Sequence, residues 1–174
     1  MSTRSLIALQ QGKTTRFITN LIDGYPTGVG QTLIQYYDTI DKVSNLINKG
    51  CASVINKDVD SPRTPSIKLN FKTAFERQNY YQQVKDRCEF EYRDWGNPLK
   101  IYELDNTDFL TYRLGKYNYD YLYLFKDGEW HCGVVGETPA IIGLVKTLLT
   151  DIPKNIPSDI YNSVPFHFKF YSNN

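Results

Sequence analysis

The chain has 174 residues, with 20 lysines and arginines against 19 aspartates and glutamates. This near-neutral balance gives no basic excess for binding nucleic-acid phosphates and no acidic excess for mimicking them. With 41% hydrophobic and 22% charged residues, the composition is typical of a single globular domain over residues 1–174.

The first elements along the chain are predicted to be two strands. Residues 5–10 are apolar, residues 14–20 are rich in β-branched and aromatic side chains, and Gln11-Gly12-Lys13 is the turn between them. The segment Asp23-Gly24-Tyr25-Pro26-Thr27-Gly28-Val29-Gly30 follows. Its three glycines and its proline predict a rigid turn, which leads into a helix over about 29–37.

A second helix is expected directly afterwards. Asp38 or Thr39 is a suitable N-cap, apolar residues recur at helical spacing from Ile40 to Ile47, and Gly50 follows as a C-terminal stop. Residues 57–66 then predict an exposed loop because they combine two prolines with four charges.

The middle of the chain predicts another strand, a helix and a hairpin. Residues 67–71 alternate like a strand, and Thr73 is a good cap for a weakly amphipathic helix ending near Arg87. Residues 88–92 alternate again, turn at 94–97, and return as a strand over 99–104.

The clearest strand signal comes late, in residues 117–125. Alternation places its aromatic residues on one face and its leucines on the other. Asp127-Gly128 predicts a tight turn into a strand over 130–135. An apolar helix over 140–149 and a closing strand over 166–170 complete the chain. Together these elements predict an α+β fold with a mainly antiparallel sheet built from hairpins and with helices grouped against it.

The glycine-rich turn is the candidate ligand site. Its backbone amides, before a helix, suit an anion, and the residues concerned are Asp23, Gly24, Tyr25, Gly28 and Gly30. A purely structural role, with glycines required for packing and Asp23 bonded to the amides of the turn, is the favoured interpretation.

Other chemical signals are weak. Gly12-Lys13-Thr14 lacks the earlier glycine of a phosphate-binding loop. Ser2 becomes an N-terminal nucleophile only if Met1 is removed. His131 and Cys132 are neighbours that a strand would point to opposite faces. The sequence therefore indicates no catalytic residue, no metal site and no cofactor.

Aromatic residues are the candidate contacts for a partner. The chain has 14 tyrosines and 9 phenylalanines against 2 tryptophans, and tyrosine combines apolar area with a polar tip that suits interfaces. The candidates are Tyr117, Tyr119, Tyr121, Tyr123 and Trp95. If the predicted helix at 140–149 covers the tyrosine row, these tyrosines are core instead.

Three features bear on location. The three cysteines are odd in number and lack paired spacing, the first residues lack an apolar signal core, and no apolar run is long enough to span a membrane. We expect a reduced, cytoplasmic protein that does not bind membranes.

Three segments carry a resemblance. The start Ser2-Thr3-Arg4-Ser5-Leu6-Ile7, together with residues 23–30, resembles a family of small uncharacterised proteins encoded by bacteriophages, prophages and bacteria, and residues 121–130 resemble its closing hairpin. Members of that family often carry a histidine and an aromatic residue before the turn, where this chain has Leu21 and Ile22.

The resemblance implies a phage-encoded protein that acts in the cytoplasm of the host cell. We expect a non-catalytic protein that binds and blocks a host protein or complex, for example a CRISPR defence effector. The alternatives are a domain that sequesters a small molecule or nucleotide at Gly24–Gly30, and an amide hydrolase using Ser2.

Overall fold

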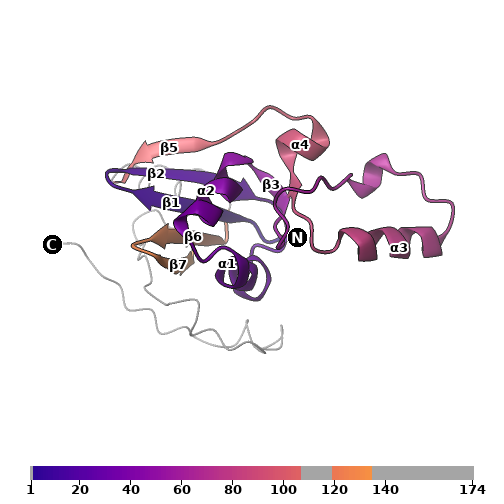
Figure 1. Ribbon diagram of the computed structural model, residues 1–174, viewed down its shortest axis with the longest axis horizontal. Helices are drawn as coiled ribbons and strands as arrows, with labels where there is room; N and C mark the ends of the chain where they lie inside the picture. The colour runs from indigo at the N-terminus through magenta and orange to yellow at the C-terminus, as the bar shows by residue number, and fades with distance from the viewer. Residues whose placement is uncertain (1, 107–118, 135–174) are drawn as a thin grey trace.

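A computed structural model describes residues 2–106 and 119–134 of the chain. These residues form an α+β fold with a seven-stranded mixed sheet in the order β4-β3-β2-β1-β6-β7, and β5 pairs with β2 outside this path (Figure 1). The strands are β1 (Ser5–Gln11), β2 (Thr14–Asn20), β3 (Ala52–Val54), β4 (Glu89–Phe90), β5 (Tyr102–Asp105), β6 (Tyr121–Lys126) and β7 (Glu129–Val134).

Among the described residues, four α-helices and two shorter helical turns lie between these strands. They are η1 (Pro26–Gly30, a π-helix), α1 (Gln31–Tyr36), α2 (Ile40–Asn48), η2 (Ser66–Lys68, a 3-10 turn), α3 (Ala74–Val84) and α4 (Glu91–Trp95). Within the described residues, no helix combines the length and the apolar character that crossing a membrane requires.

The sheet is mixed, so the expected antiparallel sheet of hairpins is wrong. β1 and β6 pair in parallel, with Ser5 opposite Tyr121 and Leu9 opposite Phe125, and β2 meets β3 in parallel at one residue pair. The predicted hairpins β1–β2 and β6–β7 do form. Alternation correctly predicted which side chains of residues 121–125 share a face, but it carried no information on which strands become neighbours.

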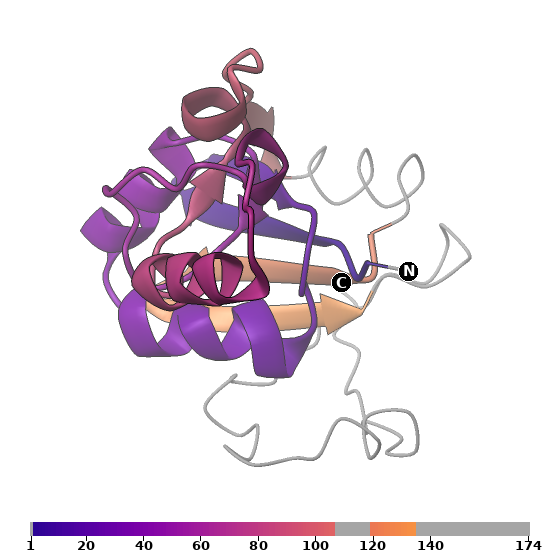
Figure 2. The ribbon, with the colours of Figure 1, turned by 90° about the vertical axis from the view of Figure 1, so that its right-hand side faces the viewer.

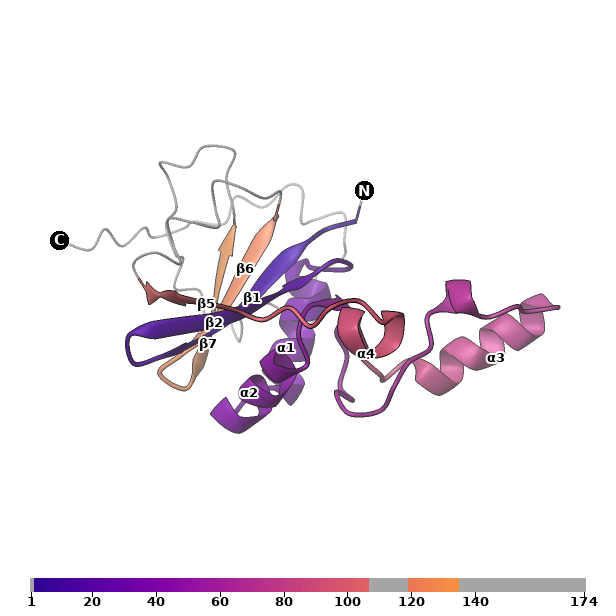
Figure 3. The same cartoon turned by 90° about the horizontal axis from the view of Figure 1, so that it is seen from above.

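β1 is buried on both faces, which explains its central place. Five consecutive residues, Ser5 to Leu9, are buried, and such a continuous run is typical of strands with parallel neighbours and two covered faces. On one face, Ile7, Leu9, Tyr123 and Phe125 belong to a core that includes residues of α1 and α2. Figure 3 shows these helices on one side of the strands.

The opposite face has its own smaller core. Its buried members come from three neighbouring strands: Leu6, Ala8, Phe17, Leu122 and Leu124. Tyr102 stacks on Phe17 with ring centroids 5.2 Å apart. The central sheet is therefore apolar on both sides.

The helix signals of the first half are confirmed. Thr39 caps α2 by accepting a hydrogen bond from the amide of Lys42, and the apolar stripe Val43, Leu46 and Ile47 faces the core. Thr73 and Glu76 form a capping box at the start of α3, which satisfies amides that the helix itself leaves unpaired.

Two strand predictions in the middle of the chain are wrong. Residues 66–68 form a 3-10 turn, and Ile67 is 79% exposed, because no neighbouring strand pairs with this segment. The strand at 88–92 ends after Phe90, where α4 begins. β5 then pairs with β2 rather than with β4, so the expected hairpin does not form.

Residues 61–87 form an arm, which contains η2 and α3 and projects from the sheet (Figures 1 and 3). In Figure 2, which views the molecule from the side on which the arm projects, α3 lies in front of the strands. Val84 is the single buried residue of α3, so this helix contributes little to the apolar core.

The predicted helix at 140–149 and the predicted strand at 166–170 lie outside the described residues, as does Tyr117.

Candidate interaction surface

The five predicted ligand residues lie in the turn between β2 and α1, and four backbone amides of this turn already have acceptors. These are the amides of Gly24, Gly28, Val29 and Gly30. They donate to carbonyl oxygens of Thr3, Asp23 and Tyr25 over 3.0–3.4 Å. An anion would have to replace these bonds, so the turn acts as a structural connection.

Close packing explains two of the glycines. A Cβ at Gly28 would lie 2.4 Å from the carbonyl oxygen of Asp23, and one at Gly24 would lie 2.8 Å from the backbone of Arg4. The Tyr123 hydroxyl donates to the carbonyl of Gly24 over 2.9 Å. The turn is thus fixed against the N-terminal segment and against the centre of the sheet.

Asp23 and Tyr25 form the exposed side of the turn. Asp23 adopts a left-handed φ of 55°, a conformation that aspartate tolerates better than most residues. Partial burial, together with the charge and hydrogen bond of Asp23, raises the pKa of Tyr25. This pair therefore keeps a protonated phenol beside a carboxylate and provides no activated nucleophile.

Of the three tyrosines of the row that the structure describes, one is fully buried and two are partly buried. Tyr123 is fully buried, and Tyr121 is half-buried against the same apolar cluster. Tyr119 precedes β6 and packs on the opposite face of the sheet. A partner cannot reach Tyr123 in the folded protein, because η1, α1 and α2 cover that face of the sheet. Tyr123 is therefore a core residue, but η1, α1 and α2 cover it, whereas the helix at 140–149 that was expected to do so lies outside the described residues.

The three cysteines Cys51, Cys88 and Cys132 are buried. Burial raises the pKa of Cys132 to about 12 and also raises that of Cys88, so neither forms the thiolate that nucleophilic catalysis needs. The Ser2 hydroxyl donates to the carbonyl of Leu21 over 2.6 Å, a group that cannot act as a base. Among the described residues, no group of three histidine, cysteine or acidic side chains could hold a metal ion.

Trp95, the remaining predicted contact, lies in a dense polar cluster at the base of the arm. Its indole nitrogen donates to Glu89 over 2.9 Å, and the ammonium of Lys68 lies 5.5 Å from its ring centroid. Arg63 forms an ion pair with Glu89 over 3.4 Å. We call this cluster the root network, and it consists of Arg63, Lys68, Glu89, Arg93, Asp94 and Trp95.

The Asp94 carboxylate is the centre of the root network. Its two oxygens accept hydrogen bonds from Nε and Nη2 of Arg93, each over 3.0 Å. They also accept from the backbone amides of Phe90 and Arg63 over 2.8 and 3.1 Å. Arg93 in turn donates to the carbonyl of Val59 over 2.8 Å. These bonds hold α4, β4 and the first residues of the arm in one orientation.

Glu89 is the second acidic residue of the root network. It is buried, and burial raises its pKa, although the hydrogen bond from Trp95 and the charge of Arg63 act in the opposite direction. The sequence prediction missed this network, because the residues that form it come from segments about 30 positions apart. The one feature of the sequence that could have indicated this network is the presence of Arg63 and Lys68 near Pro62 and Pro65.

Apolar side chains are exposed around the root network. Tyr92 on α4 is 56% exposed and Ile67 on η2 is 79% exposed, while Leu99 after α4 is 48% exposed. Lys68 joins η2 to α4 through a 2.7 Å bond to the carbonyl of Asp94. We call this region the α4 surface, and it consists of Ile67, Tyr92, Trp95 and Leu99.

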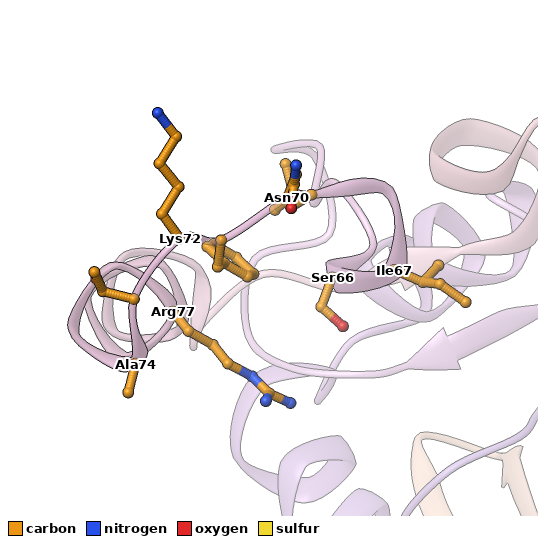
Figure 4. A pocket seen from close by; sticks show the side chains of 9 residues that line it. Ser66, Ile67, Asn70, Lys72, Ala74 and Arg77 are labelled. Atoms are coloured by element: carbon orange, nitrogen blue, oxygen red, sulfur yellow. The ribbon is translucent and has the colours of Figure 1, made fainter.

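A hollow of about 560 Å³ lies in the arm between η2 and the start of α3 (Figure 4). The Arg77 side chain extends toward Ser66, whereas the Lys72 side chain points away. Hydrogen bonds from Ser66 and Arg77 lower the pKa of Tyr81. The hollow is thus polar on its inner side and is bordered by cations.

Comparison of the chain with protein-family models, with curated proteins and with solved structures finds no match.

Proposed function

We propose that the protein is a non-catalytic binding protein that blocks a host protein by docking through its α4 surface. The observation that carries this proposal is the combination of exposed apolar side chains with a rigid polar support. Aromatic side chains held in a fixed position bind with little loss of conformational freedom, and they dominate the energetics of many interfaces.

The rigidity of the support comes from the root network. Trp95 is fixed on one side by Glu89 and covered on the other by Lys68, and Tyr92 lies one helical turn before it. A cation beside an aromatic ring adds attraction that survives partial exposure. The α4 surface therefore offers an apolar centre with a polar rim, the usual composition of a protein-binding site.

The target class follows from the resemblance of residues 2–7 and 23–30 to the phage and prophage family. We propose a host factor of a bacterium, for example a defence complex such as a CRISPR effector. The buried thiols and the occupied amides of the turn favour binding over catalysis and over capture of a nucleotide at Gly24–Gly30.

The test starts with the tagged, full-length protein and a lysate of a bacterial host. A dominant captured protein is purified and titrated against the wild type, Tyr92→Ala and Ile67→Ala. We expect each substitution to weaken binding about tenfold or more, as for contacts at the centre of an interface.

Tyr36→Ala is the matched control, because Tyr36 is a tyrosine of similar exposure on α1 (41%), away from the α4 surface. Its affinity should stay within about twofold of the wild type. Equal losses in Tyr36→Ala and Tyr92→Ala would contradict docking at the α4 surface, and the absence of any partner at micromolar protein would contradict the proposed function.

A further inference from the structure

β5 is an edge strand, because it pairs with β2 alone among the described residues. Figure 1 shows it along one border of the sheet, beside β2. The pairing is antiparallel and runs from Tyr102 opposite Phe17 to Asp105 opposite Thr14. The outer side of such a strand presents backbone amides and carbonyls that can pair with a strand from another chain.

The alternation of the ladder shows which backbone groups of β5 face outward. In an antiparallel pair, successive residues of a strand direct their amides and carbonyls to opposite sides. The amide of Asn106 donates to the carbonyl of Lys13 over 3.0 Å, so Asn106, and Leu104 two positions earlier, face β2. The amides and carbonyls of Glu103 and Asp105 therefore face outward, where no other described residue bonds to them.

The outer edge of β4, by contrast, is closed by side chains. The Asp94 carboxylate accepts a hydrogen bond from the amide of Phe90 over 2.8 Å. The Arg93 guanidinium donates to the carbonyl of Cys88 over 2.7 Å. These two bonds occupy the backbone groups that a further strand would need. Within residues 2–106 and 119–134, no side chain closes the edge of β5 in this way.

β5 is held in a fixed position against β2. At its start, the ring of Tyr102 stacks on Phe17 with centroids 5.2 Å apart. After its end, the side-chain amide of Asn106 donates to the carbonyl of Gly12 over 2.9 Å, and its oxygen accepts from the hydroxyl of Thr15 over 2.8 Å. A partner would meet an edge that is already ordered, which lowers the entropic cost of binding.

The acidic side chains of β5 lie on one face of the strand. Alternation places Glu103 and Asp105 on the same side, and both are exposed. Glu103 lies 3.9 Å from Arg16, which also donates to a side chain of α2, whereas Asp105 forms no ion pair within the described residues. Lys13 and Lys100 lie beyond the two ends of the paired segment. The edge thus presents two carboxylates and one shared guanidinium to a neighbouring strand.

The opposite face of β5 is apolar. Tyr102 and Leu104 are half-buried against the smaller core. A strand added to this edge would continue both faces, so it needs basic side chains opposite the two acidic residues and apolar side chains between them. A second copy of β5 does not fit, because its own acidic residues would lie opposite Glu103 and Asp105, and like charges directly opposite destabilise a strand pair.

We propose that the outer edge of β5 binds an extended segment of a partner protein, in which lysine or arginine alternates with apolar residues, by antiparallel strand addition. The outward amides and carbonyls bind the backbone of the segment, and the two carboxylates select its basic side chains. This inference goes beyond the proposed function, since it concerns β5 rather than the α4 surface. Its test needs purified protein and peptides only, so its failure would leave the proposed function standing.

The test is a fluorescence anisotropy titration of the full-length protein against labelled peptides of about eight residues, within the usual length of a strand. One peptide alternates lysine with valine, and the other alternates glutamate with valine. We expect the lysine peptide to bind at least about fivefold more tightly, because opposite charges across a strand pair are stabilising and like charges are destabilising.

Charge reversal should exchange the two peptides. The variant Glu103→Lys with Asp105→Lys should bind the glutamate peptide more tightly than the lysine peptide. The matched control, Asp86→Lys with Glu129→Lys, makes the same change of charge at exposed positions outside β5, and it should keep the preference of the wild type for the lysine peptide. Circular dichroism melting checks that both variants are folded.

Backbone pairing is tested with lysine peptides that carry methyl groups on backbone nitrogens. In antiparallel addition, the lysines opposite Glu103 and Asp105 direct their amides toward β5, so methylation of the lysine nitrogens should abolish binding, whereas methylation of the valine nitrogens should change the affinity by less than about twofold.

Four results would overturn the proposal. The first is the absence of binding between the folded wild type and the lysine peptide at submillimolar protein. The second is an unchanged preference in the charge-reversal variant. The third is unchanged binding of the peptide methylated on its lysine nitrogens, which would show attraction of charges without strand pairing. The fourth is a dimer in sedimentation velocity that the lysine peptide dissociates, which would assign this edge to a second copy of the chain.

Discussion

The sheet and the arm are stabilised by different kinds of interaction. In the sheet, β1 has five consecutive buried residues, and apolar clusters cover both faces. In the arm, α3 buries Val84 alone and depends on a capping box and on the root network. Burial of apolar area is not directional, whereas hydrogen bonds and ion pairs are, so the arm's orientation is set by polar geometry.

This difference predicts different sensitivities to mutation. A polar group removed from the root network leaves buried charges without partners, whereas the same change on the arm's outward face removes contacts with water alone. In the sheet, the sensitive positions are those where backbone segments approach most closely.

The largest effect is expected for Asp94→Ala. This change leaves the Arg93 guanidinium and two backbone amides without their acceptor, and breaking a buried pair typically costs about 3–5 kcal/mol. Urea denaturation measures the free energy of unfolding, and limited proteolysis should show earlier cleavage within residues 61–87. A loss below about 1 kcal/mol, the value for a surface pair, would show that the root network does not hold the arm.

The next effect is expected for Gly28→Ala. Its Cβ would meet the carbonyl oxygen of Asp23 at 2.4 Å, so the backbone of the turn must shift, at a cost of about 1–3 kcal/mol. The control is Gly96→Ala, where a Cβ meets no neighbour but φ is 78°, so that strain of about 1 kcal/mol is expected. Equal losses of stability in Gly28→Ala and Gly96→Ala would show that the turn accommodates a Cβ at position 28.

A smaller effect is expected for Tyr123→Phe. The substitution removes the buried hydroxyl that donates to Gly24, and leaving a buried carbonyl without its donor costs about 1–2 kcal/mol. Thermal denaturation measures the loss. Tyr92→Phe, at an exposed hydroxyl, should change stability by less than about 0.5 kcal/mol, and a similar change in both variants would contradict the anchoring role of Tyr123.

The smallest effect concerns pH. Because burial raises the pKa of Glu89 in the folded protein, folding takes up a proton between the ordinary glutamate pKa and the raised value. Over this window the contribution of Glu89 makes stability fall as pH rises, by at most about 1.4 kcal/mol per pH unit. Glu89→Gln should lack this contribution in denaturation curves measured from pH 4 to 7; identical slopes would show an unshifted carboxyl.

Local signals in the sequence predicted local structure well. The hairpin of β1 and β2, the Thr39 cap, the Thr73 cap and the Asp127-Gly128 turn depend on residues within a few positions of one another. The parallel pairing of β1 and β6 depends on residues far apart in the chain, and alternation cannot specify it. Ile67–Phe71 was misassigned because strand propensity requires a neighbouring strand.

The candidate site was harder to predict than the fold. Trp95 was identified from its type, but its support comes from Glu89 and Lys68, whose proximity depends on the path of the arm. The tyrosine row was recognised as a pattern, yet its exposure depended on how α1 and η1 fold over it.

The parallel pairing of β1 and β6 also affects the folding of the newly made chain. The amide of Arg4 bonds to the carboxylate of Asp120, 116 residues further along the chain. β1 therefore cannot pair with β6 until most of the chain has been synthesised. Folding that depends on such distant segments is slow. Until β6 is available, the hairpin of β1 and β2, which is apolar on both faces, is prone to aggregation.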